Sequence, residues 1–238
     1  PWENQWAAED DYFDNKGNWI GPPPAYNQEF RINFNTNNWN LMKSPSNNLP
    51  TSTYFLNLKS GSEDILNNMK SKTRYNIRLS NRKGVRVKEY GIDKLDSWYE
   101  LYKETARRNG INLQKKEFFG SILNSNGKSD VLRSILLAEY DNKPLAGMFL
   151  VLSKNMGTYL YGASSSEHRN LMGTYAVQWG AIKKAREYGC SKYDMFGTAP
   201  NSNSSHPLHG LYRFKKGFGG EMYHRMGCWD YPLNKNEY

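Results

Sequence analysis

Apolar and polar residues alternate over several short stretches of the chain, and this period-two pattern predicts β-strands. Asp141-Asn142 separates two strongly apolar stretches and has the residue types of a tight hairpin turn. Lys154-Asn155, followed by Gly157, predicts a second turn of the same kind. The strands are expected at residues 51–58, 85–90, 131–140, 143–152, 158–163, 192–196 and 221–226.

Helical periodicity occupies most of the segments between these strands, and no internal repeat is present. Ser62 predicts the start of the first helix, and Gly84 predicts its end. Gly189 likewise predicts the end of a later helix. The helices are expected at residues 63–83, 94–109, 115–123 and 174–188, with a short helical segment at 208–218.

Residues 1–50 differ from the rest of the chain. They are rich in Asn, Pro and aromatic residues, and the proline-containing stretches 21–24 and 44–50 interrupt regular structure. Four tryptophans nevertheless argue against disorder, because such large apolar surfaces normally pack against something. Since the first residue is Pro1 rather than Met, we expect residues 1–50 to be the tail of a truncated upstream domain plus a linker, followed by one domain over residues 51–238.

The composition is that of a globular chain, with 38% hydrophobic and 14% aromatic residues among 238. No apolar run approaches the roughly 20 residues that a membrane-spanning helix needs. The formal net charge is +9, but residues 1–50 hold six acids and three bases, so the remainder carries +12. Such a field attracts nucleic acid, nucleotide-linked substrates or anionic membrane surfaces, and charge alone does not distinguish them.

The cysteine and histidine residues support neither a disulfide scaffold nor a metal site. Two cysteines are too few for a disulfide scaffold, so a reducing cytoplasm is the expected location. His206 and His209 have no acidic or cysteine companions at ligand spacing. We therefore assign no metal.

Basic residues without acids mark the helix expected at 63–83. Between Asn67 and Lys88 the sequence holds eight basic residues and no acid. Like charges spaced four apart destabilise a helix, and a solvated helix face normally mixes signs, so the pattern favours phosphate binding. Four basic residues share one face through this spacing: Lys70, Arg74, Arg78 and Arg82.

The segment 211–221 combines aromatic, basic and glycine residues more densely than core packing requires. Arg213, Lys215 and Lys216 bring positive charge, while three glycines permit close approach of the backbone to a ligand. Phosphate is the natural partner of such a segment. A glycine-bearing turn with solvated lysines before the last strand explains the same composition.

The order of the expected elements from residue 85 to about 228 resembles the GNAT acyltransferase fold, an α/β (α+β) architecture with a mixed, mostly antiparallel sheet flanked by helices. In that fold the helix after the third hairpin strand begins at a turn that binds the pyrophosphate of the donor. The corresponding turn here contains Arg169 and Gly173, which are candidates for substrate binding. Because it has one glycine and the bulky Leu171 and Met172, a donor other than acyl-coenzyme A becomes attractive.

Five motifs in the right order resemble the FemABX peptidoglycan aminoacyltransferases: Met69–Arg78, Glu104–Arg108, Tyr159–Ser164, Tyr193–Gly197 and Phe214–Gly219. The resemblance implies two GNAT-like domains in tandem, of which this chain holds the second and the end of the first. It also implies transfer of an amino acid from aminoacyl-tRNA to the stem peptide of a lipid-linked or UDP-linked peptidoglycan precursor. No cofactor is implied, and a peripheral contact with the inner membrane face is compatible with it.

The same resemblance suggests individual roles. Lys215 matches the family's Phe-Lys pair and is implied to act at the reacting ester or at a precursor phosphate. Phe214 is a candidate to stack on a sugar or a base, and the Tyr161 hydroxyl is a candidate to bind the stem peptide. Lys115, at the expected start of a helix, is a candidate for a precursor diphosphate.

Three functions remain open from the sequence. The first is an aminoacyl-tRNA-dependent aminoacyltransferase, which explains both basic segments. The second is an acyl-coenzyme A dependent N-acyltransferase of the same fold. The third is a non-catalytic tRNA-binding module, for which the basic helix would suffice.

Overall fold

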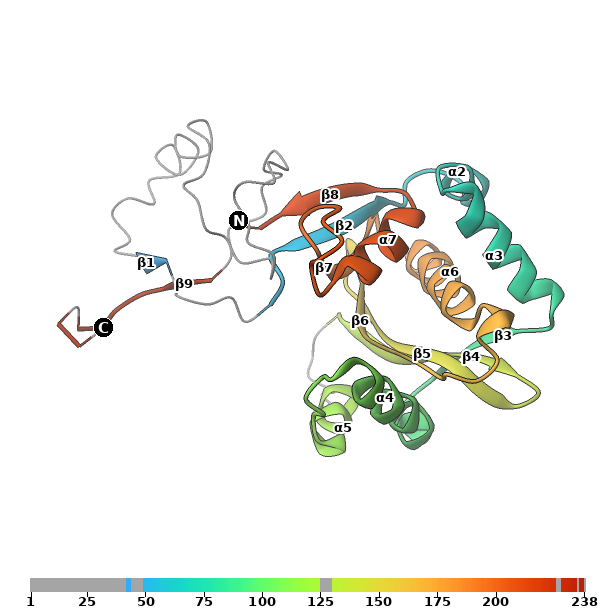
Figure 1. Ribbon diagram of the computed structural model, residues 1–238, viewed down its shortest axis with the longest axis horizontal. Coiled ribbons are helices and arrows are strands. Elements are labelled where there is room, and N and C mark those ends of the chain that lie inside the picture. Colours follow the sequence, from blue (N-terminus) through green and yellow to red (C-terminus); the bar gives the residue numbers. More distant parts are fainter. Residues whose placement is uncertain (1–41, 44–48, 125–129, 226–227, 235, 238) are drawn as a thin grey trace. The chain divides into compact units, whose positions relative to one another are not determined.

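The computed structural model describes residues 42–43, 49–124, 130–225, 228–234 and 236–237 (Figure 1). The chain divides into two compact units. The larger unit comprises Leu56–Met195 and Gly217–Gly220. The smaller unit comprises the described parts of Pro1–Phe55, Phe196–Lys216 and Glu221–Tyr238.

A mixed sheet runs through the larger unit. Its strands hydrogen-bond in the order β3-β4-β5-β6-β7. Neighbours from β3 to β6 are antiparallel, and β6 pairs with β7 in parallel over Met156–Thr158. The strands are β3 (Arg86–Tyr90), β4 (Leu132–Tyr140), β5 (Lys143–Leu152), β6 (Met156–Ser164) and β7 (Lys192–Thr198), whose last three residues belong to the smaller unit.

The turn between β4 and β5 confirms the hairpin predicted at Asp141-Asn142. Both residues have positive φ, 49° and 59°. This is the backbone geometry of a two-residue turn that matches the right-handed twist of the paired strands, and Asp and Asn tolerate it better than most residues. The long apolar strands on either side therefore pair from Tyr140 with Lys143 to Leu132 with Leu152.

Helices cover both faces of this sheet (Figure 1). On one face of the sheet, α4 packs on β5 and β6, and α5 lies beside α4. On the other face, α6 packs on β4 and β5, and α3 packs against α6. Between α4 and the sheet, Trp98 is fully buried against Phe119 and Phe149, with ring centroids 4.7 and 4.6 Å away. The helices are α3 (Ser71–Arg82), α4 (Leu95–Asn109), α5 (Lys116–Asn124) and α6 (Gly173–Glu187). Two single turns complete the unit: η3 (Ile92–Lys94) and η4 (Arg169–Leu171).

The prediction of a single helix at residues 63–83 is wrong, because the structure contains two helices there. The short α2 (Ser62–Asn67) ends before buried Met69, and α3 begins after Lys70, whose backbone is extended. The Arg74 guanidinium donates to the carbonyl oxygens of Asn67 and Met69, so it pairs carbonyl groups that the break leaves without helical partners. The end of α3 before Gly84 is as predicted, with Gly84 at φ 86°.

The smaller unit contains two short strand pairs and one helix. Strand β2 (Ser52–Asn57), whose last two residues belong to the larger unit, pairs antiparallel with β8 (Glu221–His224). Strand β1 (Met42–Lys43) pairs antiparallel with β9 (Trp229–Asp230). The helix is α7 (His209–Gly217). The preceding-domain tail expected at residues 1–50 falls mostly outside the described residues.

The predicted class, a GNAT-like α/β (α+β) architecture with a mixed, mostly antiparallel sheet between helices, is confirmed. In the part of the chain that the structure describes, no helix is long and apolar enough to cross a membrane. Within the same residues, His, Cys, Asp and Glu side chains form no group of three that could hold a metal ion.

Candidate functional site

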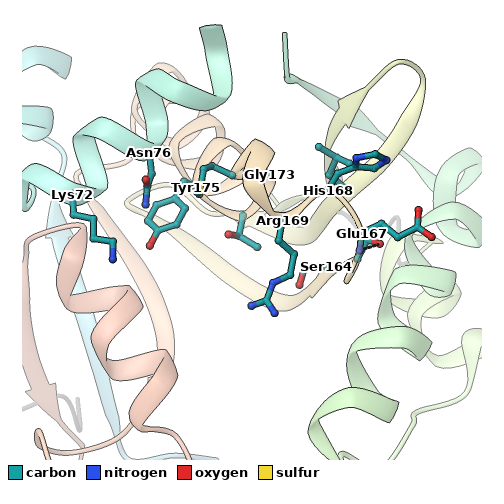
Figure 2. A pocket seen from close by; sticks show the side chains of 12 residues that line it. Lys72, Asn76, Ser164, Glu167, His168, Arg169, Gly173 and Tyr175 are labelled. Carbon is teal, nitrogen blue, oxygen red and sulfur yellow. Dashed lines mark hydrogen bonds between the residues drawn. The ribbon is translucent and has the colours of Figure 1, made fainter. Parts of the chain in front are cut away.

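A hollow of about 300 Å³ lies where α6 begins, within the larger unit (Figure 2). The start of α6 and the loop before it form one wall, and α3 contributes side chains from the other side. The residues that line it include Lys72, Asn76, Ser164, Arg169, Gly173 and Thr174.

The start of α6 makes this hollow favourable for an anion. No side chain caps this end of the 15-residue helix, and the first N–H groups of a helix have no acceptor within it. Together with the helix dipole, such N–H groups attract negative charge. A Cβ atom on Gly173 would lie 2.8 Å from the Leu145 Cβ, so glycine allows the helix start to pack directly on β5.

Side chains around the hollow add positive charge and an unused amide. Lys72 and Arg169 are exposed, and Figure 2 shows both reaching into the open space. Asn76 is only 4% exposed, and its side chain makes no hydrogen bond within the described part of the chain. The Asn76 amide faces the open space of the hollow (Figure 2), so it is available there to a ligand or to solvent. The acid Glu167 points away from Arg169 (Figure 2).

The turn before α6 has few backbone N–H groups available to bind a pyrophosphate. The Leu171 N–H donates to the His168 carbonyl at 2.9 Å, and the Met172 N–H donates to the Arg169 carbonyl at 3.2 Å. Both N–H groups are therefore used inside the protein. The hollow suits one phosphate-sized group at the first turn of α6 better than a diphosphate wrapped by the whole turn.

A second, more open hollow follows one face of α3. It is lined by Arg74, Arg78 and Arg82 together with exposed Tyr75. The structure thus brings three of the four residues of the predicted basic face to one surface, while Lys70 precedes the helix as its exposed N-cap residue. Their role in tRNA binding stays a prediction.

Lys215 lies on α7 in the smaller unit, within the helical segment that the sequence predicts at residues 208–218. The side chain is 3% exposed, and its Nζ donates to the carbonyl oxygens of Phe196, at 3.0 Å, and Gly197. Lys216, the next residue, is exposed and donates to the Tyr212 hydroxyl at 2.8 Å. Lys215 is therefore a buried, fixed cation, and Phe214 beside it is half-buried. Their roles remain predictions.

Neither Tyr161 nor Lys115 is among the residues that line the hollow at α6. Tyr161 occupies an irregularity in the β5–β6 pairing with φ 46°, and its ring packs edge-on against Phe119 at 5.1 Å. Lys115 is exposed just before α5. Burial raises the pKa of the nearby Tyr159 to about 12, so this hydroxyl stays protonated near neutral pH and is unsuited to act as a base.

Sequence reasoning missed Lys72 and Asn76. Both lie on α3 one turn apart, two positions offset from the basic series, so they face a different direction from Arg74 and Arg78. Their spacing of four was visible in the sequence, but the element they face, the start of α6, lies about a hundred residues further along the chain.

A sequence model of the FemAB family matches residues 39–141 and 133–238, which is most of the chain. The chain belongs to the FemAB family. The resemblance drawn from the five motifs is thereby confirmed. Lipid II:glycine glycyltransferase from Staphylococcus haemolyticus is 24% identical over 252 aligned positions. That match covers 79% of this chain and 60% of the relative, so this FemAB chain spans less than two thirds of that protein's length.

Three further comparisons are consistent with this assignment. Lipid II:glycine glycyltransferase from Staphylococcus aureus is 38% identical over 96 residues, covering 40% of this chain and 22% of that protein. The crystal structure of FemX matches with a TM-score of 0.75 at 20% identity, over 91% of this chain and 70% of FemX. L-PGS from Bacillus licheniformis matches less well, with a TM-score of 0.57 at 11% identity over 90% of this chain. These likenesses show a shared fold.

Proposed function

We infer that this FemAB-family chain acts as a transferase that adds an amino acid to the stem peptide of a peptidoglycan precursor. The family match and the relatives named lipid II:glycine glycyltransferase support the reaction class. We further infer that the amino acid comes from aminoacyl-tRNA. The acceptor is a lipid-linked or UDP-linked precursor.

The observation that carries the choice of donor is the hollow at α6. Its turn uses the N–H groups of Leu171 and Met172 internally, which disfavours the diphosphate of an acyl-coenzyme A. One phosphate-sized group beside Lys72 and Arg169 fits the phosphodiester backbone near the end of a charged tRNA. The arginine-lined surface of α3, with exposed Tyr75, supplies a further basic and aromatic surface of the type that binds RNA.

The chemistry requires a neutral amine to attack an activated ester, which places negative charge on the ester oxygen and then on the departing ribose hydroxyl. The N–C bond forms first and the C–O bond to ribose then breaks, while the proton lost by the attacking amine is balanced by the proton that the departing ribose oxygen gains. Lys215 is the proposed cation for the developing charge. Because two backbone carbonyls fix its Nζ, little side-chain freedom would be lost when it meets substrate.

Equilibrium binding separates the three functions left open by the sequence. We expect the protein to bind glycyl-tRNA more tightly than uncharged tRNA, and to show no micromolar binding of acetyl-coenzyme A by calorimetric titration. Micromolar binding of acetyl-coenzyme A would overturn the proposed donor. Equal affinity for charged and uncharged tRNA, together with no transfer, would instead indicate a non-catalytic tRNA-binding module.

Replacing Arg78 and Arg82 together by Gln is expected to weaken tRNA binding and to flatten its salt dependence by roughly one to two ions, since each phosphate contact releases about one counterion. These two arginines are chosen because they are exposed, whereas Arg74 holds backbone carbonyls at the α2–α3 break. The slope of log affinity against log salt is measured for both proteins. A slope that does not change in the double variant would exclude this surface from RNA binding.

A further inference from the structure

The last two turns of α4 hold the loop that leads into the hollow at α6. Three side chains there, Glu104, Thr105 and Arg108, contact the backbone or side chains of Ser164 and Ser166. These α4 residues belong to one of the five sequence motifs, Glu104–Arg108, to which no role was assigned. They are not among the residues that line the hollow. Any effect they have on a ligand there must therefore pass through the loop.

Thr105 pairs both backbone groups of Ser164, the last residue of β6. Its hydroxyl donates to the Ser164 carbonyl at 3.1 Å and accepts from the Ser164 N–H at 2.9 Å. Thr105 is 8% exposed, so these bonds are shielded from water. A single hydroxyl thus fixes the point where the strand becomes the loop.

Arg108 and Glu104 extend this hold to the next residues. The Arg108 guanidinium donates to the Ser164 carbonyl at 3.0 Å, to the Ser164 hydroxyl at 2.9 Å and to the Ser166 hydroxyl at 3.0 Å. The Glu104 carboxylate accepts the Ser166 N–H at 2.5 Å and lies 4.0 Å from Arg108. The Ser166 N–H is also the main reason why the pKa of Glu104 is lowered.

The loop after Ser166 needs such support because its backbone is strained at two places. His168 and Met172 both adopt the left-handed conformation, with φ 50° and 57°, although neither is glycine. Such conformations persist when the surrounding contacts over-determine them. Arg169 lies between these two residues, so its direction depends on the loop as a whole (Figure 2).

We propose that Glu104, Thr105 and Arg108 are positioning residues that clamp the loop 164–169, so that Arg169 and the first turn of α6 face one phosphate group of the donor. The proposal rests on the proposed function for the identity of the ligand. It assigns the Glu104–Arg108 motif a purpose that neither core packing nor direct ligand contact supplies.

The test uses the whole chain with inorganic phosphate as the probe. Binding is followed through the amide resonances of Gly173 and Thr174, and the clamp through hydrogen exchange of the amides at 164–169. Thr105→Val keeps the shape and removes the hydroxyl. We expect at least threefold faster exchange in the loop and about three- to tenfold weaker phosphate binding, the scale of one or two lost hydrogen bonds. Thr105→Ser keeps the hydroxyl and should restore both.

Glu104→Ala distinguishes the clamp from a simple effect of charge, because the two predict opposite changes in phosphate affinity. Removing an acid near an anion site should tighten phosphate binding if only charge matters. The clamp predicts weaker binding, because the Ser166 N–H loses its acceptor. Glu100→Ala is the matched control: it removes an exposed acid one turn earlier on α4, which pairs with Lys103, and it should leave the loop unaffected.

The outcomes separate this proposal from the proposed function. If phosphate does not shift the amide resonances of Gly173 and Thr174 in the unchanged protein, the proposed anion site is contradicted, and the proposed clamp is contradicted with it. If phosphate binds but Thr105→Val and Glu104→Ala leave its affinity unchanged, the clamp alone is overturned. The same holds if Glu104→Ala tightens binding as charge alone predicts.

Discussion

Lys215→Met is expected to lower kcat/KM for aminoacyl transfer by about 100-fold or more, the scale of losing one charged contact in a transition state. The lysine is buried, and its Nζ is held by the carbonyl groups of Phe196 and Gly197. Methionine fills similar space but offers no donor or charge. If Lys215 acts on the developing charge, the loss should appear in kcat, measured with saturating charged tRNA and precursor.

Lys216→Met is the control because it removes the same charge from the adjacent residue. Lys216 is exposed and contacts Tyr212, and on a helix neighbouring side chains point about 100° apart. We expect a change of less than about threefold, typical for an exposed side chain. An unfolding measurement on both variants separates loss of chemistry from loss of folding. Equal and small effects on kcat/KM would show that Lys215 has no role in the reaction.

Trp98→Ala is expected to lower the free energy of unfolding by about 3–5 kcal/mol, the range for truncating a fully buried large aromatic residue. Trp98 has no exposed surface and packs against Tyr102, Phe119 and Phe149. The adjoining Gly147 leaves room for it, since a Cβ there would lie 2.9 Å from the Trp98 ring. Urea unfolding followed by circular dichroism measures the change.

Trp98→Phe should cost far less, about 1 kcal/mol, and its comparison with Trp98→Ala tests the reason for the loss. Phenylalanine keeps most of the ring contacts. It also removes the indole N–H, which is buried and has no hydrogen-bond partner in the described part of the chain. A loss below about 1 kcal/mol for Trp98→Ala would contradict the view that this aromatic cluster holds α4 to the sheet.

The sheet and most helix positions were predictable from local patterns. Two strongly apolar stretches predicted β4 and β5, and Asp141-Asn142 predicted their turn, because both signals act over a few neighbouring residues. The break between α2 and α3 was missed. The uninterrupted basic series from Lys70 to Arg82 looks helical, and the break depends on tertiary contacts such as buried Met69 and the Lys70 N–H donating to the Gly217 carbonyl at 2.9 Å.

The candidate site was predictable only in part. The resemblance to the GNAT fold placed Arg169 and Gly173 in the turn before the helix expected at residues 174–188, and both line the hollow. Lys72 and Asn76 reach the same hollow from α3, and nothing local indicates that α3 lies against α6. The helical segment predicted at residues 208–218 corresponds to α7, but the sequence does not show that Lys215 is buried there with its Nζ held by two backbone carbonyls.

The most direct test is transfer of a labelled amino acid from charged tRNA to a peptidoglycan precursor by the purified protein. The account predicts that label enters the stem peptide of lipid II or of the UDP-linked precursor. It also predicts that Lys72→Met combined with Arg169→Ala raises the KM for charged tRNA roughly tenfold or more with a smaller effect on kcat, as expected for lost phosphate contacts. No transfer from charged tRNA, accompanied by efficient transfer from an acyl-coenzyme A, would contradict it.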